Sequence, residues 1–233
     1  MEGSSYYKNV DNYSLLAKYY DSLLQDEESL SYWLEYIEEE PFETVLELAS
    51  GSGVMAGILK RKGYSIIASD ISKEMKEAAK ANYDGEYLIL DMSDFHLDRK
   101  FDLILCICDS INYLEADELD RMFKCVYEHL NDGGRFVFDM HSMKRIEEFR
   151  DEYIEEGHIE DVDYQWTILS DDVDNTLMEH FTFYCKDGMI QEHHLQHVFE
   201  PDMIIEKLKK QGFGVRYIDD FVEDEKVLLV GRK

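Results

Sequence analysis

Basic residues are scarce in this sequence. Only 24 lysines and arginines stand against 52 aspartates and glutamates, so the formal net charge is -28 at pH 7. A surface this acidic repels the phosphates of nucleic acids and of anionic bilayers. We therefore expect neither a nucleic-acid substrate nor a membrane partner. The two short basic runs, at 60–62 and 207–210, are expected to be solvated helix faces.

Cysteine and long apolar runs are also scarce. The four cysteines form no CxxC pair, which argues against a disulfide framework and against a zinc site. No apolar stretch reaches the ~18 residues that a membrane-spanning helix requires. The opening MEGSSYYKNVDNYSLL lacks the apolar core of a secretory signal. We expect a cytoplasmic protein, either a monomer or a homodimer.

What the sequence does contain is an alternation of short apolar runs with amphipathic stretches. Two helical patterns come first, at 12–24 and 29–39, and Pro41 ends them. Apolar runs such as TVLEL, SIIAS, EYLIL, FDLILCI and GRFVFDM then alternate with helical patterns. Near-continuous apolar strands separated by helices predict a parallel sheet covered on both faces. Right-handed crossovers make such a sheet doubly wound.

The pattern changes after Asp139. Residues from about 157 to 199 alternate as antiparallel strands do, and a helix at 201–211 with two further strands resumes the α/β pattern. We therefore expect three parts: an N-terminal helical lid (1–41), a Rossmann-like cofactor-binding domain (42–150 and 200–233), and a β-rich insertion (151–199) that covers the substrate site. The acidic run at 151–163 is interpreted as a solvated surface or as a rim that attracts a cationic substrate.

The stretch TVLELASGSGVMAG, residues 44–57, places a carboxylate before a loop of small residues. Glu47 ends the apolar run, and Gly51 and Gly53 follow within the loop. Glycine-rich loops after strands commonly hold phosphate, which a neighbouring carboxylate would repel. We interpret the stretch as the binding loop for a ligand with positive charge, such as an ammonium or a sulfonium.

A rival interpretation of the same loop stays open. The spacing Gly51-x-Gly53-x-x-Ala56, with Asp70 about 20 residues further on, also fits a dinucleotide fingerprint and would predict an NAD-dependent oxidoreductase. Glu47 argues against it, because dinucleotide folds normally stay apolar up to the first glycine. We also find no convincing pair of residues for hydride transfer.

Several segments carry a family resemblance. VLELASGSG resembles the first motif of the class I S-adenosylmethionine-dependent methyltransferases, with Ala49 in place of the first glycine. ASDISKEMKEAA, LILDMSDF and FDLILCICDSINYL resemble the next motifs in order. KYYDSL, CDSINYL, FDMHS and QEHHLQ resemble the small bacterial YqeM-like methyltransferases, which are relatives of the amino-sugar N-methyltransferases. The resemblance implies an α/β fold: a doubly wound, mostly parallel seven-stranded sheet with a small antiparallel β-rich insertion.

The resemblance also implies S-adenosylmethionine as cofactor and S-adenosylhomocysteine as product. Glu47 would hold the methionine amino group and the 49–53 backbone its carboxylate, while Asp70 and Asp91 would hold the nucleoside. Tyr20 would close its hydroxyl over the cofactor, although tyrosines in such helices commonly serve packing. The residues that the resemblance assigns to the cofactor are Tyr20, Glu47, Ala49, Ser50, Gly51, Asp70, Ile71, Met75, Asp91, Met92, Cys108 and Asp109.

The segment QEHHLQH supplies candidate catalytic residues. In a strand, Glu192, His194 and Gln196 share one face, with successive members about 6.7 Å apart. They are suited to bind a substrate amine or to position a proton acceptor. The alternative is a polar face that joins the insertion to the main domain. One histidine, one glutamate and one amide make a poor transition-metal set, so we predict no metal.

His141 is the third catalytic candidate. It lies just beyond a strand in FDMHS, at the expected carboxyl edge of the sheet. A histidine there can take a proton near neutral pH, and the alternative is a role in capping the next helix.

These patterns together predict a methyltransferase that transfers a methyl group to a small-molecule acceptor. The acidic surface favours an acceptor that bears an amine. The alternatives are the NAD-dependent oxidoreductase, a non-catalytic cofactor-binding module, and a tRNA or protein methyltransferase of the same fold.

Overall fold

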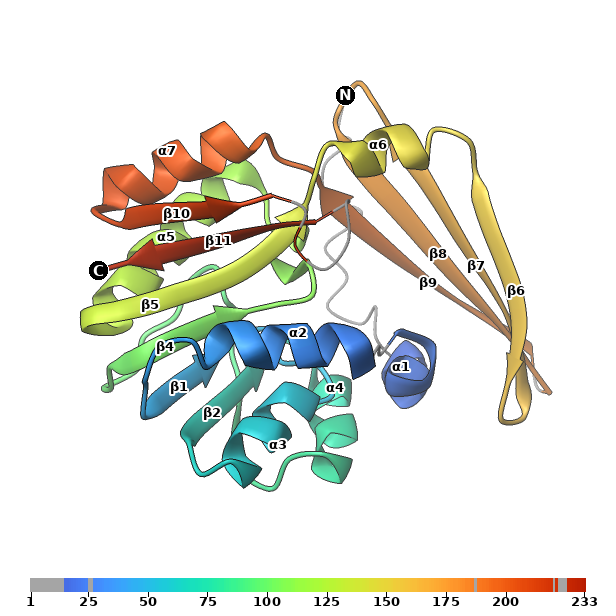
Figure 1. Ribbon diagram of the computed structural model, residues 1–233. Helices are drawn as coiled ribbons and strands as arrows, with labels where there is room; N and C mark the ends of the chain where they lie inside the picture. The colour runs from blue at the N-terminus through green and yellow to red at the C-terminus, as the bar shows by residue number, and fades with distance from the viewer. Residues whose placement is uncertain (1–14, 25–26, 187, 220, 222–225) are drawn as a thin grey trace.

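A computed structural model describes residues 15–24, 27–186, 188–219, 221 and 226–233. These residues form a seven-stranded sheet with helices on both faces and a separate four-stranded antiparallel sheet (Figure 1). Residues 1–14 of the expected lid, which include the start of the helical pattern predicted at 12–24, lie outside the described residues. No helix in the described ranges is long and apolar enough to cross a membrane.

The seven-stranded sheet follows the order β10-β11-β5-β4-β1-β2-β3. Strands β1 to β5 pair in parallel, and β11 runs antiparallel to both β5 and β10. This arrangement confirms the predicted doubly wound, mostly parallel sheet. Its strands are β1 (Thr44–Glu47), β2 (Ser65–Asp70), β3 (Glu86–Ile89), β4 (Phe101–Cys106), β5 (Leu130–His141), β10 (Gly214–Ile218) and β11 (Lys226–Arg232).

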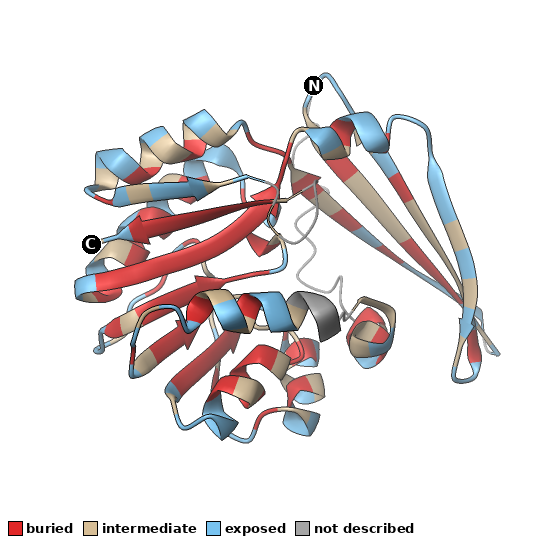
Figure 2. Cartoon of the chain, in the orientation of Figure 1, coloured by how far each residue is buried: buried red, intermediate tan, exposed pale blue. Residues whose placement is uncertain are grey.

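Apolar side chains leave the strands toward both faces, as the near-continuous apolar runs require. On one face, Phe136 and Phe138 of β5 pack in a buried cluster with α5 and α7. On the other face, Val137 joins a second cluster with α2 and α3. Figure 2 shows β5 buried along most of its length. The helices are α2 (Glu27–Ile37), α3 (Val54–Arg61), α4 (Lys73–Ala78), α5 (Ala116–His129) and α7 (Pro201–Gln211).

The helix boundaries follow from local chemistry. The hydroxyl of Ser72 accepts a hydrogen bond from the Met75 amide at 3.1 Å and so caps the start of α4. Pro201 begins α7, and Gly212 ends it with φ 106°, a left-handed conformation that glycine adopts without strain.

The second sheet has the order β6-β7-β8-β9, all antiparallel. It stands beside the main sheet, and the short helix α1 (Leu16–Leu24) lies between the two (Figure 1). Leu16 and Tyr19 of α1 pack with Phe181 and Phe183 of the second sheet. The remaining elements are α6 (Lys144–Glu148), β6 (Tyr153–Ile159), β7 (Val162–Asp171), β8 (Thr176–Cys185) and β9 (Gly188–His197).

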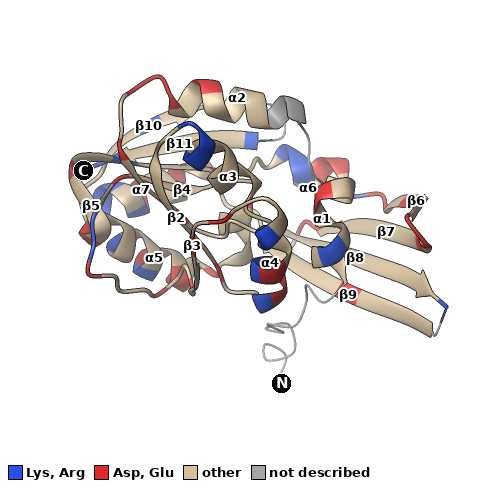
Figure 3. Ribbon diagram, turned by 90° about the horizontal axis from the view of Figure 1, so that it is seen from below, with Lys and Arg blue, Asp and Glu red and all other residues tan. Residues whose placement is uncertain are grey.

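Strand β6 was not predicted as a strand. Its sequence, YIEEGHI, belongs to the acidic run that we interpreted as surface, and its side chains are in fact exposed or half-buried. It pairs with β7 over its whole length and leaves its other side open as the edge of the sheet. Figure 3 shows acidic residues along this edge and at the turn into β7. The run is therefore both a strand and a charged surface.

Candidate active site

The parallel strands bring the predicted site residues to one edge of the main sheet. Glu47 ends β1, Asp70 ends β2, and His141 ends β5. Asp91 follows β3, and Asp109 follows β4. In a doubly wound sheet this carboxyl edge, next to the point where the strand order reverses, is where ligands bind.

The loop after β1 is shaped by left-handed backbone conformations. Gly51 and Gly53 have φ values of 53° and 74°. A Cβ on Gly53 would lie 3.1 Å from the Cβ of Ala79 and 3.2 Å from that of Tyr83, so this glycine lets the loop pack closely on the next helical segment. Ala49 also takes a positive φ, 50°, which costs an alanine about 1–2 kcal/mol. The first glycine of the resembling motif would occupy this position without that strain.

Glu47 is buried at the foot of this loop, with 2% of its surface exposed. Its Oε2 accepts a hydrogen bond from the Ser50 hydroxyl at 2.7 Å. Burial raises its pKa to about 7, while Ser50 and the Ala56 amide partly oppose the shift and the nearby Asp70 adds to it. Both hydrogen-bond partners are neutral, so the carboxylate fits a cationic ligand group, which would stabilise its charged form.

The side chain of Asp70, at the end of β2, accepts hydrogen bonds from the loop after β1 and from the start of the next segment. Its Oδ2 accepts from the Gly51 amide at 3.0 Å and its Oδ1 from the Ser72 amide at 2.9 Å. Burial raises its pKa, against these backbone hydrogen bonds. Asp70 therefore sets the position of Gly51, and its predicted contact with a ribose stays a prediction.

The residues assigned to the adenine differ in exposure. Ile71 has 45% of its surface exposed beside Asp70, whereas Met75 is 2% exposed and packs inside α4. Asp91 is exposed, and its Oδ1 accepts from the Ser93 amide at 2.8 Å. Met92 is half-buried, with its Sδ 3.9 Å from the Cys106 Sγ. Ile71 thus offers an exposed apolar side chain to a flat ligand, whereas the side chain of Met75 is buried.

Helix α1 closes on the glycine loop. A Cβ on Gly51 would lie 3.8 Å from Cε1 of Tyr20, so the Tyr20 ring lies against the loop. Its predicted closure over the cofactor stays a prediction. The next residue, Asp21, accepts hydrogen bonds from the Ser52 hydroxyl and from Nδ2 of Asn82, the latter at 2.8 Å. Asp21 and Asn82 were not predicted as site residues.

A buried charge cluster lies at the ends of β4 and β5. Lys226 of β11 places its Nζ 3.1 Å from Oδ1 of Asp109 and 4.0 Å from Oδ2 of Asp139. Burial alone would raise the pKa of Asp109, but Lys226 and His141 hold it below the usual value. Burial and the charge of Asp109 raise the pKa of Asp139. Cys108 and Asp109 have φ values of 60° and 56°, so this turn is strained and the cluster holds it in place.

His141 lies within this cluster and also contacts the second sheet. Its Nε2 is 2.9 Å from Oε1 of Gln196, and its Nδ1 is 3.8 Å from Oδ1 of Asp109. Because the amide oxygen accepts, the hydrogen sits on Nε2 and leaves the Nδ1 lone pair as an acceptor. Burial lowers the pKa of His141. It is therefore a neutral base beside Asp109, and the hydrogen bond made by its ring goes to Gln196 of β9.

The late segment folds as predicted, with Glu192, His194 and Gln196 buried on one face of β9. Glu192 serves α1: its Oε1 accepts from the Leu15 amide at 2.6 Å and from the Leu16 amide at 3.1 Å. The Nδ1 of His194 is 3.4 Å from the Tyr113 hydroxyl, and burial lowers its pKa to about 4. These contacts join the insertion to the main domain, which was the alternative interpretation. Catalytic roles for Glu192 and His194 stay predictions.

Comparison with known proteins now identifies the family. Residues 45–134 match the family described as a methyltransferase domain. YqeM of Bacillus subtilis (strain 168), whose name assigns it to the methyltransferases, is 29% identical over 91% of each chain. A solved S-adenosylmethionine-dependent methyltransferase from Clostridium acetobutylicum ATCC 824 superposes with a TM-score of 0.78 at 26% identity, over 94% of this chain and 98% of that one. Residues 45–134 are thus a methyltransferase domain, and the similarity over nearly the whole chain supports a class I S-adenosylmethionine-dependent methyltransferase.

This result confirms the predicted family and favours it over the dinucleotide interpretation of the loop. A sugar N-methyltransferase, KedS8 from Streptoalloteichus, has the same fold, with a TM-score of 0.79 at 20% identity over 93% of this chain and 91% of that one. The matched residues 45–134 run from β1 into β5. They therefore contain the glycine loop after β1 and the carboxylates at or just beyond the ends of β1 to β4.

The sequence analysis missed Asp139 and Lys226 of the buried charge cluster. Asp139 was noted only as the end of an apolar run, and Lys226 lies in one of the two further strands expected after the helix at 201–211. The antiparallel register that sets Lys226 opposite His141 is what brings them together. Only the pairing of β11 with β5, which the apolar pattern alone does not specify, could have revealed the cluster.

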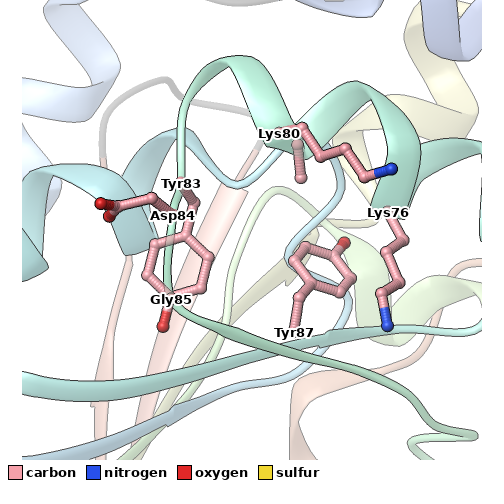
Figure 4. A pocket seen from close by; sticks show the side chains of 7 residues that line it. Lys76, Lys80, Tyr83, Asp84, Gly85 and Tyr87 are labelled. Atoms are coloured by element: carbon pink, nitrogen blue, oxygen red, sulfur yellow. The ribbon is translucent and has the colours of Figure 1, made fainter.

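Two surface cavities lie away from the carboxyl edge of the main sheet. One of about 290 Å³ is lined by Lys76, Lys80, Tyr83 and Tyr87 (Figure 4). Tyr87 turns its hydroxyl from this cavity toward the loop and donates to the Gly51 carbonyl at 2.6 Å. The other, of about 310 Å³, lies near Arg135 at the opposite edge of the sheet. None of the predicted site residues lines either cavity.

Proposed function

We propose that this methyltransferase transfers a methyl group from S-adenosylmethionine to a small-molecule acceptor. The observation that carries the proposal is Glu47, a buried carboxylate at the carboxyl edge of the sheet with neutral hydrogen-bond partners. The amino group of the methionine moiety is a cation that would stabilise this carboxylate. The Clostridium acetobutylicum relative is named as S-adenosylmethionine-dependent, which supports the same cofactor here.

The remaining cofactor residues follow from their places around the loop. The loop backbone at 49–53 would hold the carboxylate of the methionine moiety, and Asp70, which already accepts from the Gly51 amide, would hold the ribose. Ile71 and the backbone of Met92 would contact the adenine, with Asp91 at its edge. Cys108 and Asp109 would line the methionine end, where their strained turn reaches the site.

When bound, S-adenosylmethionine supplies a methyl group on a sulfonium, which is already a good leaving group. The task of the protein is then to align the acceptor, and such alignment can contribute about 7–11 kcal/mol. His141 is suited to take a proton from an acceptor amine or hydroxyl, because its Nδ1 lone pair is free of hydrogen and its protonated form would lie beside Asp109.

The second sheet supports a small acceptor. We propose that residues 151–199 cover the substrate site and that residues 1–41 act as its lid. The buried face of β9 turns His194 toward Tyr113, which follows β4 at the same edge. Glu179 adds a carboxylate on the neighbouring strand, with its pKa raised to about 7 by burial, and accepts from Trp166 at 3.0 Å. Aromatic rings and carboxylates together suit an acceptor amine.

Calorimetric titration with S-adenosylmethionine, S-adenosylhomocysteine and NAD tests the proposal. We expect micromolar affinity for the two adenosyl sulfur compounds and none for NAD. Binding of NAD alone would show that the loop is a phosphate cradle. Salt-dependent binding of tRNA would replace the small acceptor with a nucleic acid.

A further inference from the structure

The outer face of the second sheet carries a pair of histidines that the proposed chemistry does not use. His180 of β8 and His193 of β9 are directly opposite each other in the antiparallel register. Their ring centroids are 4.5 Å apart at an interplanar angle of 77°, and their Nδ1 atoms are in contact. His193 is exposed and His180 half-buried, so a solute can reach the pair.

The pair has the chemistry of a metal chelate. Two imidazole nitrogens about 2.0–2.1 Å from one ion lie about 2.9 Å apart at the right angle of Cu(II) and about 3.3 Å apart at the tetrahedral angle of Zn(II). Directly opposed side chains on neighbouring strands reach these separations with small rotations.

The surroundings favour a cation. Glu152 contributes a negative charge that acts on His180, and the whole chain has a net charge of -28. Within the described part of the chain, no cluster of three or more histidine, cysteine, aspartate or glutamate residues could hold a metal ion. The pair would therefore supply two ligands, and water would complete the coordination.

We propose that His180 and His193 form a surface site for a first-row transition-metal ion that prefers imidazole. The site takes Cu(II) most tightly and Ni(II) and Zn(II) more weakly, in the order common to such ligands. The bound ion joins β8 to β9 on the face opposite to Glu192, His194 and Gln196. It thereby braces the strand that holds α1 and His141.

The sequence analysis considered a metal only on the other face of this strand. A metal was considered for the Glu192 face of QEHHLQH and set aside, because that face has a single histidine. His193 points the other way, and its partner lies thirteen positions earlier on the opposite strand. The register of the β8–β9 hairpin is what creates the pair.

Titration of the untagged, full-length protein with CuCl₂, NiCl₂ and ZnCl₂ in a non-chelating buffer tests the site. We expect one Cu(II) per chain, a rise in Tm with the metal, and an affinity at least tenfold lower in His193→Ala. His158→Ala is the matched control, because His158 is an exposed histidine of the same sheet; it should bind as the wild type does.

Electron paramagnetic resonance gives a second measurement. The Cu(II) spectrum should show two equatorial imidazole nitrogens in the wild type and fewer in His180→Asn, a variant to use if His193→Ala folds poorly. Absence of binding by the wild type would overturn the proposal. Equal losses in His193→Ala and His158→Ala would also overturn it, since they would mean that any exposed histidine binds the metal.

Discussion

The two sheets each bury a glutamate, and they use it in opposite ways. Glu47 and Glu192 are 2% and 3% exposed. Glu192 is engaged by the backbone amides of Leu15 and Leu16, so its charge holds α1 in place. Glu47 has a hydroxyl and an amide for partners, and its pKa rises to about 7. Burial alone therefore does not distinguish a binding residue from a positioning residue; the partners of the carboxylate do.

Glu47→Gln should produce the largest effect. Removing one charge of a buried pair costs about 3–5 kcal/mol, so the affinity for S-adenosylmethionine should fall at least a hundredfold. Glu192→Gln is the matched control and should bind the cofactor as the wild type does. Calorimetric titration of both variants with S-adenosylmethionine measures the two affinities. Equal affinities would contradict the assignment of Glu47 to binding and of Glu192 to positioning.

Glu47→Gln should also stabilise the cofactor-free protein at alkaline pH. An ordinary glutamate has a pKa of 4.5, and in the fold Glu47 has a pKa of about 7. As pH rises from 4.5 to 7, the unfolded chain loses this proton while the folded chain keeps it, so wild-type stability falls. Above pH 7 the full cost is about 3 kcal/mol. Urea unfolding should show Glu47→Gln gaining this amount at pH 8 and little at pH 4, and a gain that does not vary with pH would contradict the assignment.

Glu192→Gln should show a smaller effect of the opposite sign. The charged carboxylate serves the first amides of α1 and complements the positive end of the helix, which is worth about 1 kcal/mol. The variant should therefore unfold more easily, and the α1 amides should exchange hydrogen faster. If Glu192 also touches the acceptor, turnover will fall while cofactor affinity stays unchanged. If the α1 amides of the variant exchange hydrogen at the wild-type rate, Glu192 does not position α1.

Ala49→Gly should have the smallest effect. Ala49 has a φ of 50°, and glycine would relieve about 1 kcal/mol of left-handed strain, offset in part by the greater freedom of glycine in the unfolded chain. We expect a rise in Tm of a few degrees with cofactor affinity unchanged. A fall in Tm would show that the alanine methyl packs usefully against the loop.

The contrast between the glutamates also explains what the sequence could reveal. Glu47, Gly51 and Asp70 belong to one strand-loop-helix-strand unit, so their spacing along the chain is enough to place them at one edge. Glu192 meets Leu15 across 177 residues, and no local pattern records that contact. The same holds for Lys226, which reaches Asp109 only through the pairing of β11 with β5.

The second sheet was predicted except for its edge strand, β6. Alternating apolar residues predicted β7, β8 and β9, because one face of each is buried against α1 and the main domain. Strand β6 has no such alternation: its exposed and half-buried side chains are mostly polar or charged. Backbone pairing with β7 holds it in the sheet, and backbone hydrogen bonds are made by every residue type alike.

The acidic edge formed by β6 has a consequence for how copies of this chain meet one another. An open strand edge presents unpaired N–H and C=O groups, to which any extended segment of another molecule can add as a further strand. Glu155 and Glu156 lie on β6, and Glu160 and Asp161 lie at its turn. Like charges brought together by two β6 edges repel, so this edge is protected from pairing with the same edge of another copy. The acidity of this stretch thus guards against fibrous self-assembly in a crowded solution.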